Sequence, residues 1–213
     1  MRAEYLRKLA GHEEIDYGFV MSALNGYAAP RDKITAWLKS KELLRVKKGL
    51  YVFGSNIALQ SYSKEVLANL MYGPSAISMN YALSYYGLIP ERVNTVTNIT
   101  NNRFKSYSTP VGAFKYYYLN SEKYSVGIVL NQTLNNQSYL IATPEKALCD
   151  QIHIADKDIY LDNLTDLEKY LLFDLRIDED VLIKFKLTQL EEIAHCYRDA
   201  RIELLYQYIK SRK

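Results

Sequence analysis

The sequence predicts an α+β fold in two parts, a small N-terminal domain over residues 1–54 and a larger domain over residues 55–213. Three observations support this division. The length of 213 residues suits one small and one medium domain. Apolar residues recur at helical spacing near both ends of the chain, whereas the middle is rich in short strand-like runs. The composition also changes near residues 54 and 154.

The N-terminal part begins with two short predicted helices. Tyr5, Leu6 and Leu9 recur at helical spacing. A second helical stretch covers about residues 16–24, where an Asn-Gly pair breaks it. Two helices are therefore expected before the first loop.

A third helix is predicted over about residues 30–41. Pro30 suits a first helical position, because the N–H that proline lacks would be unpaired there. Ile34, Trp37 and Leu38 then repeat at i, i+3 and i+4 and form an apolar stripe. That stripe should face the core of the N-terminal domain.

The segment LLRVKKGLYVF predicts a β-hairpin directly after this helix. Two runs of apolar, β-branched or aromatic residues flank a basic turn, and Gly49 supplies the positive φ that a tight turn requires. Three short helices followed by a basic hairpin is the order of a winged helix-turn-helix, whose third helix enters the DNA major groove. We therefore expect that fold over residues 1–54.

The middle of the chain is predicted to pair helices with a mostly antiparallel sheet. Helices are expected over about residues 62–71 and from Ser78 to near Gly87. Strand-like runs separated by turn residues follow, at residues 93–99, 104–108, 112–119, 126–130 and 138–142.

The last third is predicted to be helical. Thr143, Pro144 and Glu145 form a strong helix start, because they supply a capping hydroxyl, a first-turn proline and a carboxylate near the positive end of the helix dipole. From Asp162 onward the apolar spacing is helical almost throughout. The predicted larger domain is thus a mixed helix and antiparallel-sheet domain with a helical C-terminal part.

Charge and cysteine content narrow the class of protein. The net charge of +3 is distributed unevenly along the chain: residues 1–54 carry +4, and residues 155–213 carry −3. An anionic partner would therefore be expected to bind at the N-terminal end. No stretch has the composition of a signal peptide or a membrane span. The two cysteines, Cys149 and Cys196, are too few for a disulfide framework. We expect a cytoplasmic protein with no membrane partner.

Three ordered blocks resemble the AbiE-type abortive-infection antitoxins, or AbiEi family transcriptional regulators. They are YGPSAISMNYALSYYGLIPERVNTVTNIT, TPVGAFKYYYL and ATPEKALCDQI. With the predicted winged helix, the resemblance covers roughly residues 15–155. It implies a protein of a type IV toxin-antitoxin system that acts in phage defence. Such a protein represses its own operon by binding inverted repeats in its promoter, and it counteracts a neighbouring nucleotidyltransferase toxin.

Candidate DNA-binding residues lie on the third helix and on the hairpin. The apolar stripe turns short polar and basic side chains of the helix outward, where they suit entry into a groove. Long cations at the hairpin suit contact with the sugar-phosphate backbone or an adjacent minor groove. The predicted DNA-binding residues are Arg31, Lys33, Thr35, Lys39, Arg45, Lys47 and Lys48.

Other candidate sites carry weaker signals. Tyr116, Tyr117 and Tyr118 suggest a base-stacking platform, but consecutive strand residues alternate faces, so packing in and around the core is the better account. A zinc site combining Cys149 and His153 with the His195-Cys196 pair has no Cys-x-x-Cys or comparable knuckle to support it, so two isolated thiols with ordinary histidines is the better account. We therefore expect neither a metal nor another cofactor.

An enzymatic function has little support in the sequence. Asp156 and Asp158 resemble the paired carboxylates of nucleotidyltransferases, but they stand about a hundred residues after the Gly54-Ser55 turn and follow a predicted helix. The chain has no Ser-His-Asp set, phosphate-binding glycine loop or HExxH motif. We expect a protein that is not an enzyme.

Two other functions remain open from the sequence. The winged helix could serve protein contact alone, in a toxin-binding module without DNA affinity, or the chain could be a metabolite-responsive repressor with a ligand pocket in the sheet. No heptad seam offers a dimer interface. We therefore expect a monomer or weak dimer whose protomers bind the two halves of an inverted repeat separately.

Overall fold

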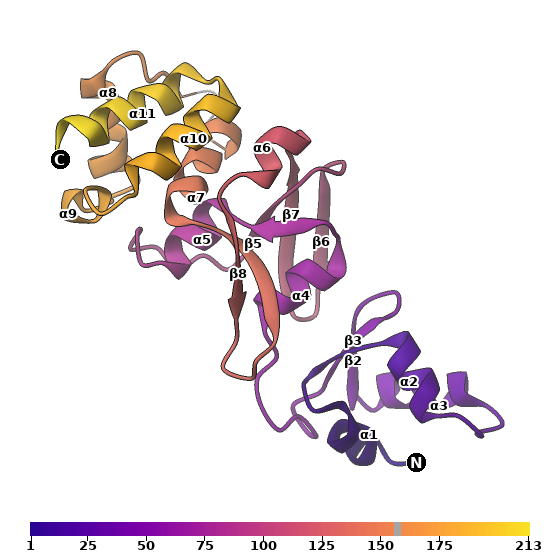
Figure 1. Cartoon of the computed structure of the whole chain (residues 1–213). Helices are drawn as coiled ribbons and strands as arrows, with labels where there is room; N and C mark the ends of the chain where they lie inside the picture. The colour runs from indigo at the N-terminus through magenta and orange to yellow at the C-terminus, as the bar shows by residue number, and fades with distance from the viewer. Residues whose placement is uncertain (156–158) are drawn as a thin grey trace.

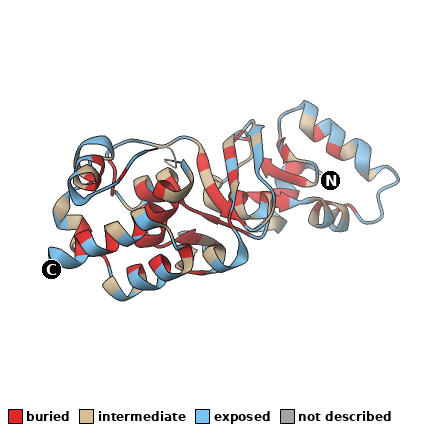
Figure 2. Cartoon of the chain, turned by 90° about the horizontal axis from the view of Figure 1, so that it is seen from above, coloured by how far each residue is buried: buried red, intermediate tan, exposed pale blue. Residues whose placement is uncertain are grey.

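The chain has an α+β fold in a computed structural model that describes residues 1–155 and 159–213. Figure 1 shows three successive regions: an N-terminal part in indigo, a central sheet, and helices at the C-terminal end in orange and yellow. Viewed from above, the two termini lie toward opposite ends of the molecule (Figure 2). In the described ranges, no helix has the length and apolar character needed to cross a membrane.

The N-terminal part contains three helices and a three-stranded antiparallel sheet with strand order β1-β3-β2. Pro30 begins α3, as predicted, and Asp16 caps the start of α2 by accepting a hydrogen bond of 2.7 Å from the Phe19 N–H. The elements are α1 (Ala3–Ala10), β1 (Glu14–Asp16), α2 (Tyr17–Ala23), α3 (Pro30–Lys39), β2 (Leu43–Lys47) and β3 (Leu50–Phe53).

This part has its own apolar core. Ile34 and Trp37 are buried on the inner face of α3, as their spacing predicts, and Leu38 packs at the edge. Tyr51 and Phe53 of β3 close the core from the side of the sheet. The outer face of α3 is left to solvent.

The larger part is built on a six-stranded sheet with order β6-β7-β5-β4-β9-β8. Its strands are β4 (Ser75–Ile77), β5 (Val96–Thr100), β6 (Lys105–Thr109), β7 (Gly112–Tyr118), β8 (Ile128–Gln132) and β9 (Ser138–Ala142). The helices that accompany it are α4 (Lys64–Met71), α5 (Met79–Tyr85), α6 (Ser121–Ser125) and α7 (Pro144–Asp150).

The sheet is mixed: three of its five strand pairs are antiparallel, in keeping with the expectation of a mostly antiparallel sheet, and the other two are parallel. β5 pairs with β7, and β4 with β9, in parallel. The hairpin of β6 and β7 folds back so that β7 lies between β6 and β5. β4 is absent from the strands predicted from the sequence, because a strand of three residues is too short to show a periodic pattern.

The C-terminal part is helical, as predicted. It consists of the π-helical segments η1 (Gln151–Ala155) and η2 (Tyr170–Asp174) with α8 (Leu164–Lys169), α9 (Glu179–Leu182), α10 (Leu187–Tyr197) and α11 (Ala200–Ser211). Its inner faces join the large apolar core beneath the sheet.

A buried polar network connects this helical part to the sheet. Lys146 and Asp150, one turn apart on α7, form an ion pair of 2.8 Å and are both fully buried. Ser78, which precedes α5, donates a hydrogen bond of 2.5 Å to Asp150, and the Tyr197 hydroxyl of α10 bonds both members of the pair. The network thus joins residues from the first and third of the three sequence blocks.

The two parts of the molecule are packed together. Val46, Leu50 and Val52 face away from the N-terminal core and join the large core instead. Glu14, buried in β1, accepts hydrogen bonds from the Ser63 N–H at 2.5 Å and from the Gln137 side-chain amide at 2.9 Å. The three-stranded sheet therefore separates two cores and contributes to both.

A second buried carboxylate fixes the connection between the parts. Glu13 forms a buried ion pair of 2.6 Å with Arg7 and accepts hydrogen bonds from the backbone N–H groups of Leu59 and Gln60 at 3.0 and 2.9 Å. Charged acceptors make strong hydrogen bonds when they are buried. The chain between the two parts is therefore held at several points.

Candidate nucleic-acid interface

A groove of about 710 Å³ lies between α3 and the hairpin of β2 and β3. Its basic and polar side chains come from both elements: Arg31 and Thr35 from α3, Arg45 from β2, and Lys48 from the turn. The apolar lining consists of Tyr17, Ile34, Leu38 and Tyr51 together with Gly49. Four of the seven predicted DNA-binding residues thus share one groove.

The charge of this groove is entirely positive among the described residues. Arg31, Arg45 and Lys48 line it, and none of its lining residues is an aspartate or glutamate. All three cationic side chains are exposed. A concave surface with several cations and no carboxylate favours a polyanion, because each contact with a phosphate releases condensed counterions.

Tyr17, the first residue of α2, organises the groove. Its backbone N–H donates a hydrogen bond of 2.9 Å to the Gly49 carbonyl, which ties the hairpin turn to α2. Its hydroxyl accepts a bond of 3.3 Å from the Arg31 Nε. Tyr17 is not among the residues predicted from the sequence, because an aromatic residue at a helix start has no pattern that marks it as a support for other side chains.

The backbone at Gly49 has the conformation expected of a tight turn. Its φ is +86°, in the left-handed region that glycine adopts without a steric cost. β2 and β3 are paired up to Lys47 and Leu50, so the turn contains only Lys48 and Gly49. This places Lys48 at the tip of the hairpin.

Thr35 lies on the exposed face of α3. Its hydroxyl donates a hydrogen bond of 3.0 Å to the carbonyl of Arg31, one turn earlier. With that proton engaged, Thr35 presents outward its methyl group and the lone pairs of its oxygen. These groups suit the methyl of thymine or an exocyclic amino group in the major groove.

Two predicted residues of α3 lie outside the groove. Lys39 is exposed near the end of the helix, on the same side as Thr35 by helical spacing, but it does not line the groove. Lys33 is half-buried, and its amino group lies 5.9 Å from the centre of the Trp37 ring. This cation–π contact directs Lys33 away from the exposed face.

Lys47 is directed toward the larger part of the chain. Its amino group donates a hydrogen bond to the carbonyl of Met71 at the end of α4, and burial lowers the pKa of this amine. A bulge between Arg45 and Lys47 breaks the regular alternation of β2. The bulge separates two side chains that the sequence pattern places on one face, so we omit Lys47 from the interface.

The three consecutive tyrosines of β7 divide between the core and the surface, as alternation predicts. Tyr116 is fully buried and donates a hydrogen bond of 2.7 Å to the Ala68 carbonyl. Tyr117 packs edge-on against Phe104 at 5.4 Å, and Tyr118 is exposed. No single platform presents all three rings.

The cysteines and histidines considered for zinc have other surroundings. Cys149 is fully buried, and burial raises the pKa of its thiol. His153 contacts Asp199 at 2.8 Å through Nδ1 and Lys123 at 3.1 Å through Nε2. Within the described ranges, no group of three or more His, Cys, Asp or Glu side chains is arranged to hold a metal ion. The Asp156 and Asp158 pair lies outside the described residues.

Comparison with known proteins adds no relative to these observations. The chain matches no protein-family model and none of the curated proteins.

Proposed function

We propose that this chain is a cytoplasmic DNA-binding repressor and antitoxin whose residues 1–54 are a winged helix-turn-helix. The observation that carries the DNA-binding half is the groove between α3 and the hairpin, where three exposed cations meet without a carboxylate. The element order α1, β1, α2, α3, β2, β3 supports the same interpretation, since it is the order of winged helices.

In this proposal α3 enters the major groove of double-stranded DNA. Thr35 and Lys39, on its exposed face, contact base edges, whereas Arg31 beside the hairpin contacts a phosphate or a guanine edge. Arg45 and Lys48 contact the sugar-phosphate backbone from the hairpin. Binding is expected at inverted repeats in the promoter of its own operon.

A binding measurement with a matched control tests this half. Fluorescence anisotropy compares a labelled fragment of the upstream DNA with a random duplex, at several salt concentrations. Replacing Arg31, Arg45 and Lys48 by alanine should lower the slope of log affinity against log salt by about one unit for each phosphate that is no longer neutralised. Replacing the exposed Lys169 and Lys184 by alanine should leave the slope unchanged. If both variants had the same salt slope, the groove would not be the DNA-binding surface.

The antitoxin half is supported by the resemblance of the three sequence blocks to AbiE-type antitoxins. These blocks fold into β4, α5, β5, β7 and α7 of the larger part. We therefore assign neutralisation of a neighbouring nucleotidyltransferase toxin to residues 55–213.

Co-expression with the product of the adjacent gene tests this assignment. The full chain should restore growth. If residues 1–54 alone restored growth without reducing toxin transcription, the assignment to the larger part would be wrong.

A further inference from the structure

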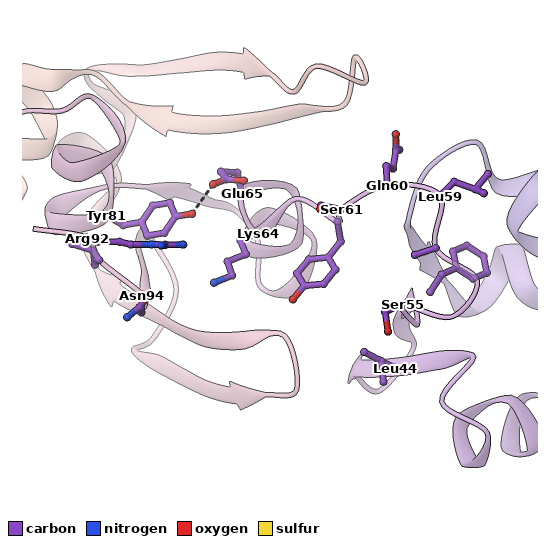
Figure 3. Close-up of a pocket in the computed structure, with 14 residues that line it drawn as sticks. Leu44, Ser55, Leu59, Gln60, Ser61, Lys64, Glu65, Tyr81, Arg92 and Asn94 are labelled. Carbon is purple, nitrogen blue, oxygen red and sulfur yellow. Dashed lines mark hydrogen bonds between the residues drawn. The ribbon is translucent and has the colours of Figure 1, made fainter.

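A second concave region lies on the other side of β2, between the two parts of the molecule. This cleft has a volume of about 950 Å³. One wall is formed by the β2–β3 hairpin and the connection over residues 55–62, and the other by the start of α4, by α5 and by the loop before β5. Figure 3 shows the labelled residues of both walls, with Lys64, Tyr81 and Arg92 on one side and Leu44, Ser55 and Leu59 on the other.

Two cations line the cleft without a partner in the part of the chain that the structure describes. They are Lys64, on the first turn of α4, and Arg92, in the loop before β5. Neither side chain makes an ion pair or hydrogen bond with another described residue. In Figure 3 both side chains belong to the larger part, and that of Arg92 points toward Lys64.

The one carboxylate among the described lining residues is already engaged. Glu65 accepts a hydrogen bond of 2.5 Å from the Tyr81 hydroxyl and one of 2.7 Å from the Ser63 hydroxyl, one on each carboxylate oxygen. Burial and the hydrogen bond to Glu65 raise the pKa of Tyr81, so this phenol stays a protonated donor. Glu65 is therefore tied to its own wall, and the cations are left for an external anion.

The opposite wall has both apolar and polar residues. Leu44, Phe53, Ala58 and Leu59 supply its apolar side chains, and Leu59 is 73% exposed, whereas Ser55, Gln60 and Ser61 are polar. An exposed leucine beside a cavity offers contact area for an apolar group, at about 25 cal/mol for each Å² buried. The wall of the larger part thus suits a charged group, and the apolar side chains of the other wall offer contact to an apolar body.

We infer that this cleft binds a small organic anion that carries a carboxylate or phosphate group on an apolar body. Lys64 and Arg92 bind the anionic group, with the Asn94 side chain within the same lining as a hydrogen-bonding group. The apolar body lies against Leu44 and Leu59 of the opposite wall.

The position of the cleft gives such a ligand a route to the DNA interface, an effect that rests on the proposed function. Leu44 lines the cleft, whereas Arg45, the next residue of β2, lines the groove beside α3. A ligand that contacts both walls restricts the hairpin relative to the larger part. Its binding and DNA binding should therefore be coupled.

Calorimetric titration without DNA tests the site itself. The probes are phenyl phosphate and benzoate as organic anions, inorganic phosphate as the charge alone, and phenol as the apolar body alone. We expect saturable binding of at least one organic anion with one site per chain. A stronger response to phenyl phosphate identifies a phosphate site, and a stronger response to benzoate a carboxylate site.

Matched variants assign the binding to the cleft. Replacing Lys64 and Arg92 by methionine should weaken the organic anion about tenfold or more, since each charged hydrogen bond removed is worth a factor of this order. Replacing Arg103 and Lys105, which are exposed and lie outside the cleft, by methionine should change nothing.

Three results would overturn the inference: no saturable binding of either organic anion, equal binding by the Lys64 and Arg92 variant, or phenol or inorganic phosphate binding as tightly as the organic anion. The titration contains no DNA, so its outcome is independent of the proposed function. If the organic anion bound but left the DNA affinity unchanged, the ligand site would stand and only its coupling to DNA binding would be wrong.

Discussion

Lys47 and Lys48 are neighbours in the sequence but differ in what their amino groups contact. The Lys47 amine donates a hydrogen bond to the Met71 carbonyl, whereas Lys48 is exposed at the hairpin tip beside the groove. The sequence pattern groups them because both are lysines of a basic turn. A bulge in β2 is a property of strand pairing, and no local pattern in these residues indicates it.

The two lysines therefore give opposite predictions. Lys48→Ala should weaken specific and random DNA alike and lower the salt slope by about one unit. Lys47→Ala should leave the slope unchanged and lower the free energy of unfolding by about 1 kcal/mol, because it removes a part-buried hydrogen bond to Met71. Anisotropy at several salt concentrations and urea unfolding measure the two quantities. A reduced salt slope in the Lys47 variant would mean that Lys47 does contact DNA.

The shifted pKa of Asp199 leads to a prediction of how the stability of the protein changes at acidic pH. Burial pushes the pKa of this carboxyl up, but hydrogen bonds from His153 and Arg201 outweigh that effect and hold the pKa well below its usual 3.8. A carboxyl whose pKa is depressed in the folded state contributes stability above its unfolded pKa, and this contribution is lost as the pH falls through the folded value.

Asp199→Asn should therefore lower stability at neutral pH and reduce its decline below about pH 4. Urea midpoints between pH 2 and 7 check this expectation, with the exposed Asp162→Asn as the control. An Asp199 variant whose midpoints fell in parallel with those of the wild type across this range would contradict it.

At the scale of elements, α3 carries the prediction about sequence preference. Ile34 and Trp37 are buried against the N-terminal core, so Thr35 and Lys39 must face outward. Replacing either by alanine should reduce the preference for the operator over random DNA by about 1–3 kcal/mol, the worth of one base contact. Lys33→Ala is the control, because Lys33 lies over the Trp37 ring. An unchanged ratio of specific to random affinity in both variants would mean that α3 does not read bases.

The long helices could be predicted from the sequence, and the shortest strands could not. The apolar spacing of α3 and the Thr143 cap of α7 are local signals, and both mark elements of the structure. β1 and β4 have three residues each, which is too few to display alternation. Their positions are set by pairing with β3 and β5, which lie far away in the sequence.

The buried pair on α7 predicts an asymmetry between single and double substitutions. Lys146→Met leaves Asp150 as a buried carboxylate without its cation and should cost about 3–5 kcal/mol of stability. Adding Asp150→Leu removes that uncompensated charge, so the double variant should be more stable than Lys146→Met alone. Urea unfolding of the wild type, of Lys146→Met and Asp150→Leu singly, and of the double variant completes a double-mutant cycle. A double variant less stable than the Lys146 variant would show that Ser78 and Tyr197 depend chiefly on the carboxylate.

At the scale of the whole molecule, the candidate site was only partly predictable. The spacing of α3 and the basic hairpin located the groove residues Arg31, Thr35, Arg45 and Lys48. The cleft between the two parts had no sequence signal, because its walls come together only through the packing of the hairpin against the larger part. The mixed sheet has the same origin, since alternation specifies a strand but not its neighbour.

The shared three-stranded sheet predicts that the two parts unfold together. Val46, Leu50 and Val52 of this sheet belong to the large core, and its other face belongs to the N-terminal core. Trp37, the single tryptophan, lies in the N-terminal core, so its fluorescence reports that part alone. Circular dichroism reports mainly the larger part, because most of the helices and strands are there. Urea transitions measured by the two methods should coincide in the wild type.

Glu14 is the residue whose loss should separate the two transitions. It accepts hydrogen bonds from Ser63 and Gln137, which belong to the other side of the junction. Glu14→Ala leaves both donors without this acceptor, at a cost of about 1–3 kcal/mol for each one that stays buried. The junction is weakened while the large core is retained, so the Trp37 transition should move to lower urea before the dichroism transition does. Glu4→Ala, on the exposed side of α1, is the matched control and should leave the two curves superimposed. Separate transitions in the wild-type chain would instead mean that the N-terminal part, with its three-stranded sheet, unfolds independently of the larger part.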